Sequence, residues 1–386
     1  MLNSTVAPEQ TTLWSPDHVA GVLDARLPAI PLITAADVHD ILPGFQLWDC
    51  WTIDTPHGDA AALDGWTPWV IMCAPRNLHP DQRHDVARLR LMIERAGEWR
   101  DCGYLLPDDL NPGSREWAGS TVYDPETRRV TLFYTVTGRR GEASPSFEQR
   151  LFQTEGELTE VDGLPRVTDW SLPRENVVSD GIDYMIVDKH EGMPGLIKGF
   201  RDPFHFRDPA DGSDYLLFTG SLQQSSSDHN GAIGIARSTD GGYADWHLLP
   251  PLISADGLNN ELERPILRFV DGLYYIFWST QHKVFASDGP TGPTGLYGMV
   301  ADSILGPYRP LNQTALVAPN PAAEPFQTYS WWVTQTLEVA GFVDLWGLEG
   351  QDPVTNPALV ARNFGGTLAP RFHLALRGQT AHIIPS

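Results

Sequence analysis

The stretch RDPFHFRDPADGSDYLLFTG, residues 201–220, indicates how this chain is built. An Arg-Asp-Pro tripeptide precedes a short apolar strand, an acidic turn and an aromatic strand that ends in Thr-Gly. The same order recurs in REWAGSTVYDPETRRVTLFYTVTG from Arg115 and in ERPILRFVDGLYYIFWST from Glu263. Short runs rich in β-branched and aromatic residues, separated by Asp-Gly or Asp-Pro turns, predict β-hairpins. We therefore expect a repeated strand–turn–strand unit.

Two looser copies extend the series. WDCWTIDTPHGDAAALDGWTPWVIMCAP begins at Trp48, and QTYSWWVTQTLEVAGFVDLWG covers residues 327–347. Four or five such units favour radial repetition, which is a β-propeller. In a propeller the innermost strands start near the central axis, so the charged residues that open the units would converge. A two-sheet sandwich of similar hairpins is the alternative, and it would scatter those charges.

Helical patterns are scarce. DHVAGVLDA, residues 17–25, predicts one short helix, and HDVARLRLMIERAGEWR, residues 84–100, has only a mixed periodicity. The chain of 386 residues exceeds the size at which chains usually divide into domains, unless a closed β or α/β architecture grows as one unit. Hydrophobic residues make up 41% of the chain and allow a large core.

The net charge of −22 restricts the partners that the chain can have. An acidic surface repels phosphate backbones and anionic lipids, which argues against nucleic-acid and membrane partners. No stretch reaches the ~18 apolar residues of a membrane span. The cysteines Cys50, Cys73 and Cys102 are odd in number and form no Cys-x-x-Cys, so neither a disulfide scaffold nor a structural zinc site is expected. Uncharged ligands fit this composition.

Three acids stand at the starts of the repeated units: Asp49, Asp202 and Glu263. Converging carboxylates with tryptophan neighbours suit glycosidic bond cleavage, in which one attacks the anomeric carbon and one protonated acid donates to the leaving oxygen. A third can stabilise the developing positive charge. Each acid also has a plainer interpretation: a turn residue at Asp-Pro, a surface ion pair at Glu-Arg, or a hydrogen bond from an indole to Asp49.

Arg-Asp-Pro occurs twice, and the two copies differ in context. The second copy runs into the turn cluster ADGSD, so Asp208 is expected to be a hairpin residue, whereas Asp202 opens the unit. The chain contains no His-Glu-x-x-His, P-loop, Gly-x-Gly-x-x-Gly or Gly-x-Ser-x-Gly motif. We therefore expect no cofactor and no metal.

Several longer motifs resemble the bacterial levansucrases and inulosucrases of glycoside hydrolase family 68. The resemblance runs from about residue 13 to residue 331 and rests on TLWSPDHV, LWDCW, REWAGS, FRDPF, LPPLISADGLNNELERP, DGLYYIFWS, GLYGMVADSILGPYRPLN and EPFQTYS. It implies a single five-bladed propeller over residues 1–386, with 1–12 as a flexible tail, and a funnel-shaped pocket that acts on sucrose. It also implies export to the periplasm or the outside, although no basic n-region and apolar run of a cleavable signal is visible.

The resemblance also implies residue roles. Asp49 falls on the nucleophile of the Trp-Asp motif, Asp202 on the transition-state stabiliser, and Glu263 on the general acid/base. Burial and the neighbouring carboxylates should raise the pKa of Glu263, although Arg264 opposes this if it points inward. Six further residues match contacts to the sugar: Trp48, Trp117, Arg201, Glu261, Arg264 and Tyr329. Trp51 is expected only to pack beneath Trp48 and Asp49.

The chain departs from the family pattern beside the acceptor sugar. STQHKVF resembles a Ser-His-Lys segment but carries an extra glutamine, so either Gln281 or His282 faces the acceptor. The order His-Lys favours His282. Trp331 follows Gln-Thr-Tyr-Ser where many relatives have histidine, and no calcium motif can be placed. The expected activity is fructosyl transfer from sucrose to sucrose, fructan or water, with mainly hydrolytic β-fructofuranosidase activity and a non-catalytic sugar-binding propeller as alternatives.

Overall fold

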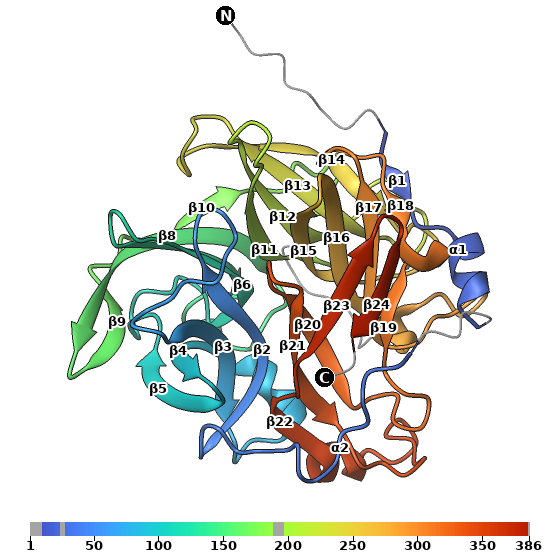
Figure 1. The fold of residues 1–386 in the computed structure, drawn as a ribbon, viewed down its shortest axis with the longest axis horizontal. Helices are drawn as coiled ribbons and strands as arrows, with labels where there is room; N and C mark the ends of the chain where they lie inside the picture. Colours follow the sequence, from blue (N-terminus) through green and yellow to red (C-terminus); the bar gives the residue numbers. More distant parts are fainter. Residues whose placement is uncertain (1–9, 24–27, 188–196, 385–386) are drawn as a thin grey trace, which may run out of the picture.

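The computed structural model describes residues 10–23, 28–187 and 197–384. Its strands fall into five consecutive groups around one centre, and the colours in Figure 1 follow them from blue through green and yellow to red. Strand β2 contacts β20, β21 and β22, so the first group lies beside the last. The predicted five-bladed β-propeller is confirmed.

The blades have the following strands. Blade one contains β2 (Phe45–Asp54), β3 (Thr67–Pro75), β4 (Arg88–Arg95) and β5 (Glu98–Tyr104). Blade two contains β6 (Arg115–Asp124), β7 (Arg129–Thr137) and β8 (Gln149–Val161), with β9 (Leu164–Thr168) and β10 (Arg174–Val177) on β8. Blade three contains β11 (Phe200–Arg207), β12 (Asp214–Ser221), β13 (Gly231–Ser238) and β14 (Trp246–Ser254).

The last two blades follow the same order. Blade four contains β15 (Glu263–Val270), β16 (Leu273–Thr280), β17 (Gly295–Ala301), β18 (Arg309–Pro310) and β19 (Leu316–Pro319). Blade five contains β20 (Thr328–Val333), β21 (Glu338–Leu345), β22 (Phe364–Leu368), β23 (Phe372–Arg377) and β24 (Thr380–Ile384). Neighbouring strands within a blade are antiparallel, while β2 and β6 join the first two blades through a short parallel pairing. Each sequence repeat thus became the two inner strands of one blade.

Every innermost strand contains a β-bulge near its start. The pairing register shifts between Leu47 and Cys50, Trp117 and Gly119, Arg201 and Phe204, Glu263 and Ile266, and Tyr329 and Trp332. In three blades a residue within the bulge has a positive φ: Asp202 (60°), Arg264 (51°) and Ser330 (58°). A bulge redirects side chains out of the normal alternation. The same device therefore aims one residue of each blade at the axis.

Gly119 is required by the close approach at the second blade's bulge. A Cβ at this position would lie 1.9 Å from the carbonyl oxygen of Phe133 on the neighbouring strand. No side chain fits there without moving the backbone. The glycine of REWAGS is thus a packing residue of the innermost strand.

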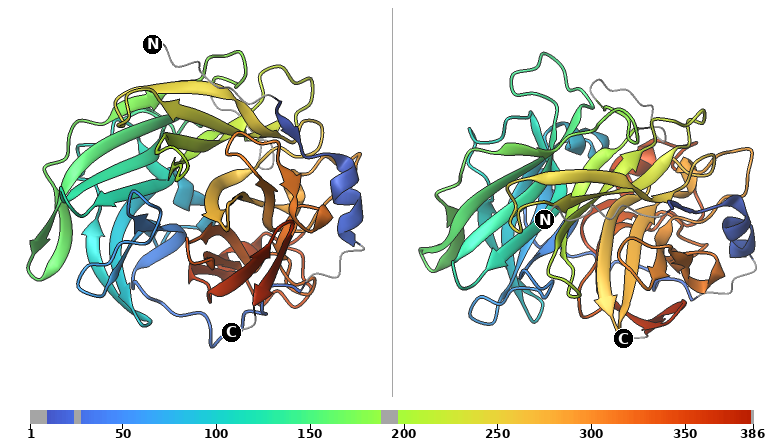
Figure 2. Two further views of the ribbon diagram at one scale, coloured as in Figure 1. Left: turned by 45° about the horizontal axis from the view of Figure 1, so that its top comes forward. Right: turned by 90° about the horizontal axis from the view of Figure 1, so that it is seen from above.

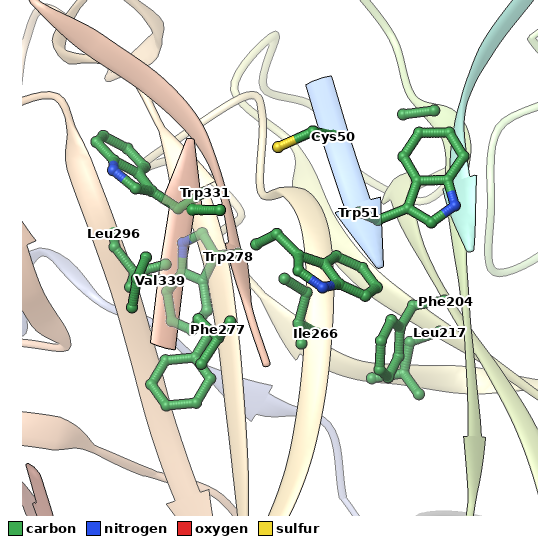
Figure 3. Close-up of a cluster of buried hydrophobic side chains, with 14 of the residues drawn as sticks. Cys50, Trp51, Phe204, Leu217, Ile266, Phe277, Trp278, Leu296, Trp331 and Val339 are labelled. Atoms are coloured by element: carbon green, nitrogen blue, oxygen red, sulfur yellow. The ribbon is translucent and has the colours of Figure 1, made fainter. Parts of the chain in front are cut away.

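A continuous aromatic core fills the space between the blades. Figure 3 shows Trp51, Trp278 and Trp331 among aliphatic side chains from several blades. Trp51 is fully buried and its indole nitrogen donates to the hydroxyl of Thr121 at 3.0 Å. It is a core residue, as the sequence indicated.

Residues 84–100, whose periodicity is mixed, form strands. They contain no helix beyond the end of η2 (Pro80–Asp85); instead β4 and β5 form a hairpin. Ala96 and Gly97 both have positive φ (50° and 85°), the conformation of a tight hairpin turn. Arg90 pairs with Asp101 at 2.6 Å, which accommodates an arginine in a mostly buried strand.

The N-terminal region is partly as expected. Helix α1 (Pro16–Ala20) and the turn η1 (Gly21–Leu23) occupy the predicted helix, and residues 24–25 lie outside the described residues. Residues 1–9 of the expected tail also lie outside them, but Thr12 already belongs to β1 (Thr12–Leu13), which pairs with β14.

The other α-helix among the described residues is α2 (Ala358–Asn363), and the further short 3₁₀ turns are η3 (His282–Val284) and η4 (Leu311–Gln313). None of the described helices has the length and apolarity of a membrane span. Figure 2 shows α1 on the periphery.

Candidate active site

The three predicted acids share one site at the centre of the propeller. Asp49 lies in the bulge of β2, Asp202 in that of β11, and Glu263 begins β15. Burial raises the pKa of Asp202 to about 7, with further upward contributions from the charges of Glu263 and Asp49 and an opposing one from Arg201. Burial also raises the pKa of Asp49, although Arg264 opposes it. Carboxylates that affect each other in this way stand close together.

Asp202 is fixed by hydrogen bonds from three blades. Its backbone N–H donates to the hydroxyl of Thr135 at 2.8 Å. Its Oδ2 accepts from the hydroxyl of Thr219 at 3.1 Å and from the backbone N–H of Arg264 at 3.3 Å. The positive φ of Asp202 is thus held by its surroundings, which is typical of strained residues at functional sites.

Arg201 is surrounded by carboxylates. Its Nη2 lies 2.6 Å from Oε1 of Glu263 and 3.6 Å from Oε2 of Glu261, and its Nε lies 3.6 Å from Oδ2 of Asp202. The side chain is only 6% exposed. One buried guanidinium therefore balances three carboxyl groups.

Glu263 and Glu261 differ in pKa, contrary to the expectation that the pKa of Glu263 is raised. Burial alone would raise it, but the Arg201 guanidinium and a hydrogen bond from the Tyr329 hydroxyl lower it below the ordinary value. Burial and the charge of Glu263 instead raise the pKa of Glu261 to about 7. The pKa values of the two neighbouring glutamates are thus shifted in opposite directions, and the carboxylate form is favoured on Glu263.

The side chain of Arg264 hydrogen-bonds both β2, the strand that carries Asp49, and β20 of the adjacent blade. Its guanidinium donates to the carbonyl oxygen of Cys50 at 2.8 Å and to the hydroxyl of Ser330 at 2.9 Å. Ser330 also hydrogen-bonds the Asp49 carboxylate and lowers its pKa. The structure therefore places Arg264 beneath Asp49, against protein groups. Ser330 was not identified from the sequence, because a serine after Gln-Thr-Tyr matches no functional motif. Only the bulge seen in the structure turns it toward Asp49.

Trp48 and Trp117 form an aromatic wall with a histidine between them. The ring of His84 is edge-on to both indoles, at centroid distances of 5.7 and 6.1 Å. The Trp117 indole nitrogen donates to the His84 carbonyl oxygen at 3.2 Å, and the Arg83 guanidinium lies 5.7 Å from the Trp48 ring. Burial and nearby cations, Arg83 first, hold the pKa of His84 well below its ordinary value, so the imidazole is neutral.

Arg83 and His84 were not identified from the sequence. They lie in η2, outside the repeated units, and HPDQRHD reads as a polar loop. The Arg83 charge nevertheless lowers the pKa of Asp49. Only the path of the loop after β3 brings this segment to the site, and no local pattern indicates that path.

The structure separates the two candidates for the acceptor position. Gln281 lies near the Tyr329 hydroxyl, the group that donates to Glu263. His282 begins η3, and its Nδ1 hydrogen-bonds the carbonyl oxygen of Gly292 at 2.9 Å. The favoured His282 thus contacts a loop through Nδ1, while Gln281 lies beside a residue that contacts Glu263, and which of the two meets an acceptor stays a prediction.

Asp208 occupies the β11–β12 turn as expected, but it is buried. Its Oδ1 accepts hydrogen bonds from the Tyr274 hydroxyl at 2.7 Å and from the Ala210 N–H at 2.9 Å. It is 4% exposed. Asp208 is therefore a structural turn residue rather than an exposed one.

No group of three or more histidine, cysteine, aspartate or glutamate side chains in the described ranges is arranged to hold a metal ion. All three cysteines are buried and unpaired with each other.

A five-bladed propeller with three carboxyl groups and an aromatic wall at its axis defines a glycoside-cleaving class of protein. A family model described as levansucrase/invertase matches residues 1–230 and 222–384. The chain belongs to this family of glycoside hydrolases and fructosyltransferases, and it is an enzyme.

Individual relatives agree with this assignment. A levansucrase of Zymomonas mobilis is 32% identical over 367 residues, covering 88% of this chain and 82% of the relative. An inulosucrase from Halalkalicoccus jeotgali, solved bound to kestose, superposes with a TM-score of 0.88 at 36% identity, covering 97% of this chain and 95% of that one. A levansucrase from Gluconacetobacter diazotrophicus has a TM-score of 0.83 at 25% identity, over 100% of this chain and 91% of the other.

Proposed function

We propose that this enzyme is a retaining fructosyltransferase that cleaves sucrose, releases glucose and transfers the fructosyl unit to sucrose, a fructan chain or water. The observation that carries the proposal is the convergence of Asp49, Asp202 and Glu263 on one buried site in a chain of this family. Kestose is bound by the inulosucrase neighbour, which supports oligosaccharides as acceptors here.

In the first half of the proposed reaction, Asp49 attacks the anomeric carbon of the fructosyl unit. The bond to the glucosyl oxygen breaks, and Glu263 gives that oxygen a proton, so that glucose leaves and a fructosyl–Asp49 ester remains. Asp202 accepts hydrogen bonds from sugar hydroxyls and stabilises the positive charge of the transition state. A double displacement requires the Asp49 and Glu263 carboxyl groups about 5–5.5 Å apart.

In the second half, an acceptor hydroxyl attacks the anomeric carbon of the fructosyl–Asp49 ester, and the bond from this carbon to the Asp49 oxygen breaks. Glu263, now ionised, takes the proton of that hydroxyl, and Asp49 leaves as a carboxylate. Transfer exceeds hydrolysis only when an acceptor sugar is held at the anomeric carbon, because water has free access to an open funnel. Gln281 is the proposed acceptor contact, since an amide both donates and accepts hydrogen bonds to hydroxyls.

The test is the release of both sugars from sucrose over a time course. Glucose release establishes cleavage, and free fructose well below glucose establishes transfer. Equal amounts would identify a mainly hydrolytic β-fructofuranosidase, and sugar binding without glucose release would identify a non-catalytic propeller. The three acids favour an enzyme over the latter, because binding requires no nucleophile and acid pair.

We also propose that the enzyme acts outside the cytoplasm, in line with its extracellular class of substrate. Separating culture medium, periplasm and cytoplasm of the producing cell and assaying each for glucose release from sucrose tests this. Activity confined to the cytoplasmic fraction would refute it.

A further inference from the structure

A cavity of about 260 Å³, lined by both apolar and charged residues, lies on the face of the propeller opposite the catalytic acids. Asp124 and Arg207, which line it, are the last residues of β6 and β11, whereas the acids lie at the starts of the innermost strands. From Asp202 to Arg207 the chain rises by roughly 17 Å at ~3.3 Å per residue. The cavity is therefore separate from the active site.

Its charges are already balanced. Arg129 is paired with Glu155 across β7 and β8. Arg207 forms two hydrogen bonds, each of 3.0 Å, with the buried carboxylate of Asp214. The remaining carboxylate, Asp124, accepts from Thr127 and from a backbone N–H. Both guanidinium groups of the lining are thus paired, and one further carboxylate remains. The described part of the lining therefore offers no free cation and repels anions.

Tyr243 lines the same space. Its ring is fixed by stacking on Trp246 (6.3 Å, 6° between planes) and by edge contacts with Phe133 (5.3 Å) and His205 (5.1 Å). The charged groups that act on the phenol are Asp214, Arg207, Asp124 and Glu155, and none of the described residues accepts a hydrogen bond from its hydroxyl. A fixed hydroxyl without a protein partner is available to a ligand.

We propose that this cavity is a second, non-catalytic site that holds one neutral sugar unit of a fructan or oligosaccharide chain. Its volume lies just below the ~300–1,000 Å³ of pockets for larger ligands, which fits a single ring. Sugar hydroxyls both donate and accept, so they match the alternating carboxylates, guanidinium groups and hydroxyls of Tyr243 and Thr131. A long product chain that binds there stays attached to the enzyme after it leaves the acids, which raises its effective concentration as an acceptor. The inference rests on the proposed function.

The test uses the full chain carrying Asp49→Asn, so that no sugar is turned over, and kestose as the probe. Calorimetric titration is expected to show two kestose molecules per chain. Adding Tyr243→Phe and Glu155→Gln together should weaken one of them at least tenfold and leave the other unchanged. Tyr104→Phe, an exposed tyrosine on β5, is the matched control and should change neither. One kestose per chain, or two sites that are insensitive to the double substitution, overturns the proposal.

A second measurement distinguishes this idea from the proposed function. In the enzyme with Asp49 intact, Tyr243→Phe with Glu155→Gln should release glucose from sucrose at the initial rate of the parent and give shorter products. No glucose release by the parent would refute the proposed function. The second site is tested independently of that result by the number of kestose molecules that bind to the Asp49→Asn protein. Unchanged product length would refute the role of the cavity in holding a chain.

Discussion

Replacing Arg201 by methionine should make the stability of the protein strongly dependent on pH. The substitution keeps an unbranched apolar stem but removes the cation that contacts Glu263, Glu261 and Asp202. Removing one partner of a buried pair costs about 3–5 kcal/mol, because the remaining charges are left uncompensated. The buried carboxyl groups avoid this cost by taking up protons.

The sign follows from the pKa values. Asp202 and Glu261 have pKa values of about 7, above the values of about 4 in an unfolded chain, and Arg201 lowers both, so its loss raises them further. The folded variant then binds more protons than the unfolded one from about pH 4 to above pH 7. Its free energy of unfolding must fall as the pH rises through this window. The cost of Arg201→Met should therefore be small at pH 5 and complete at pH 8.

Thermal melting at the two pH values measures this difference. An unfolding entropy of about 2.1 cal/mol/K per residue gives about 0.8 kcal/mol/K for 386 residues, so 3–5 kcal/mol lowers Tm by about 4–6 °C. Arg309→Met is the control, because its pair with Asp302 is exposed and such pairs contribute at most about 1 kcal/mol. An equal loss of Tm at pH 5 and pH 8 in Arg201→Met would refute the balance of charges described for the site.

Three further outcomes are expected. Asp49→Asn should keep the native melting curve and lower kcat for glucose release by roughly 10⁴-fold or more, and appreciable residual turnover would exclude Asp49 as the nucleophile. Asp202→Ala should abolish activity. Asp208→Ala should leave kcat unchanged and cost about 1–3 kcal/mol of stability, because it leaves the buried hydroxyl of Tyr274 unpaired. An inactive Asp208→Ala would show that the second Arg-Asp-Pro copy, and not the first, supplies the functional aspartate. Gln281→Ala should raise the ratio of free fructose to glucose and His282→Ala should leave it unchanged; the opposite pattern would return the acceptor contact to His282.

The repeat of strand, acidic turn and aromatic strand predicted hairpins, because hairpin patterns are local, and favoured a propeller over a two-sheet sandwich; the five blades followed from the resemblance to the family. The bulges were not predictable, since a bulge is a mismatch between two strands and each strand alone looks regular. Residues 84–100 show the same limit. Their apolar positions fit neither period well, and the turn at Ala96 and Gly97 determines the hairpin.

In the site, the identity of the acids could be predicted and their electrostatics could not. The expected rise in the pKa of Glu263 assumed that burial and neighbouring carboxylates dominate. The structure places the Arg201 guanidinium and the Tyr329 hydroxyl directly on this carboxylate, and they reverse the shift. A pKa depends on distances between side chains from different blades, which no single motif contains.

The direction of the Glu263 pKa shift bears on how cleavage would begin. Arg201 and Tyr329 favour the ionised form of Glu263, whereas a general acid must carry a proton before it can donate one. A sugar whose hydroxyl groups take over the donors of Arg201 and Tyr329 would remove the two interactions that stabilise the Glu263 carboxylate. Its pKa would then rise, and the neighbouring Glu261, whose pKa is raised to about 7, is a nearby source of a proton. Substrate binding would thus prepare Glu263 to act as the proposed acid.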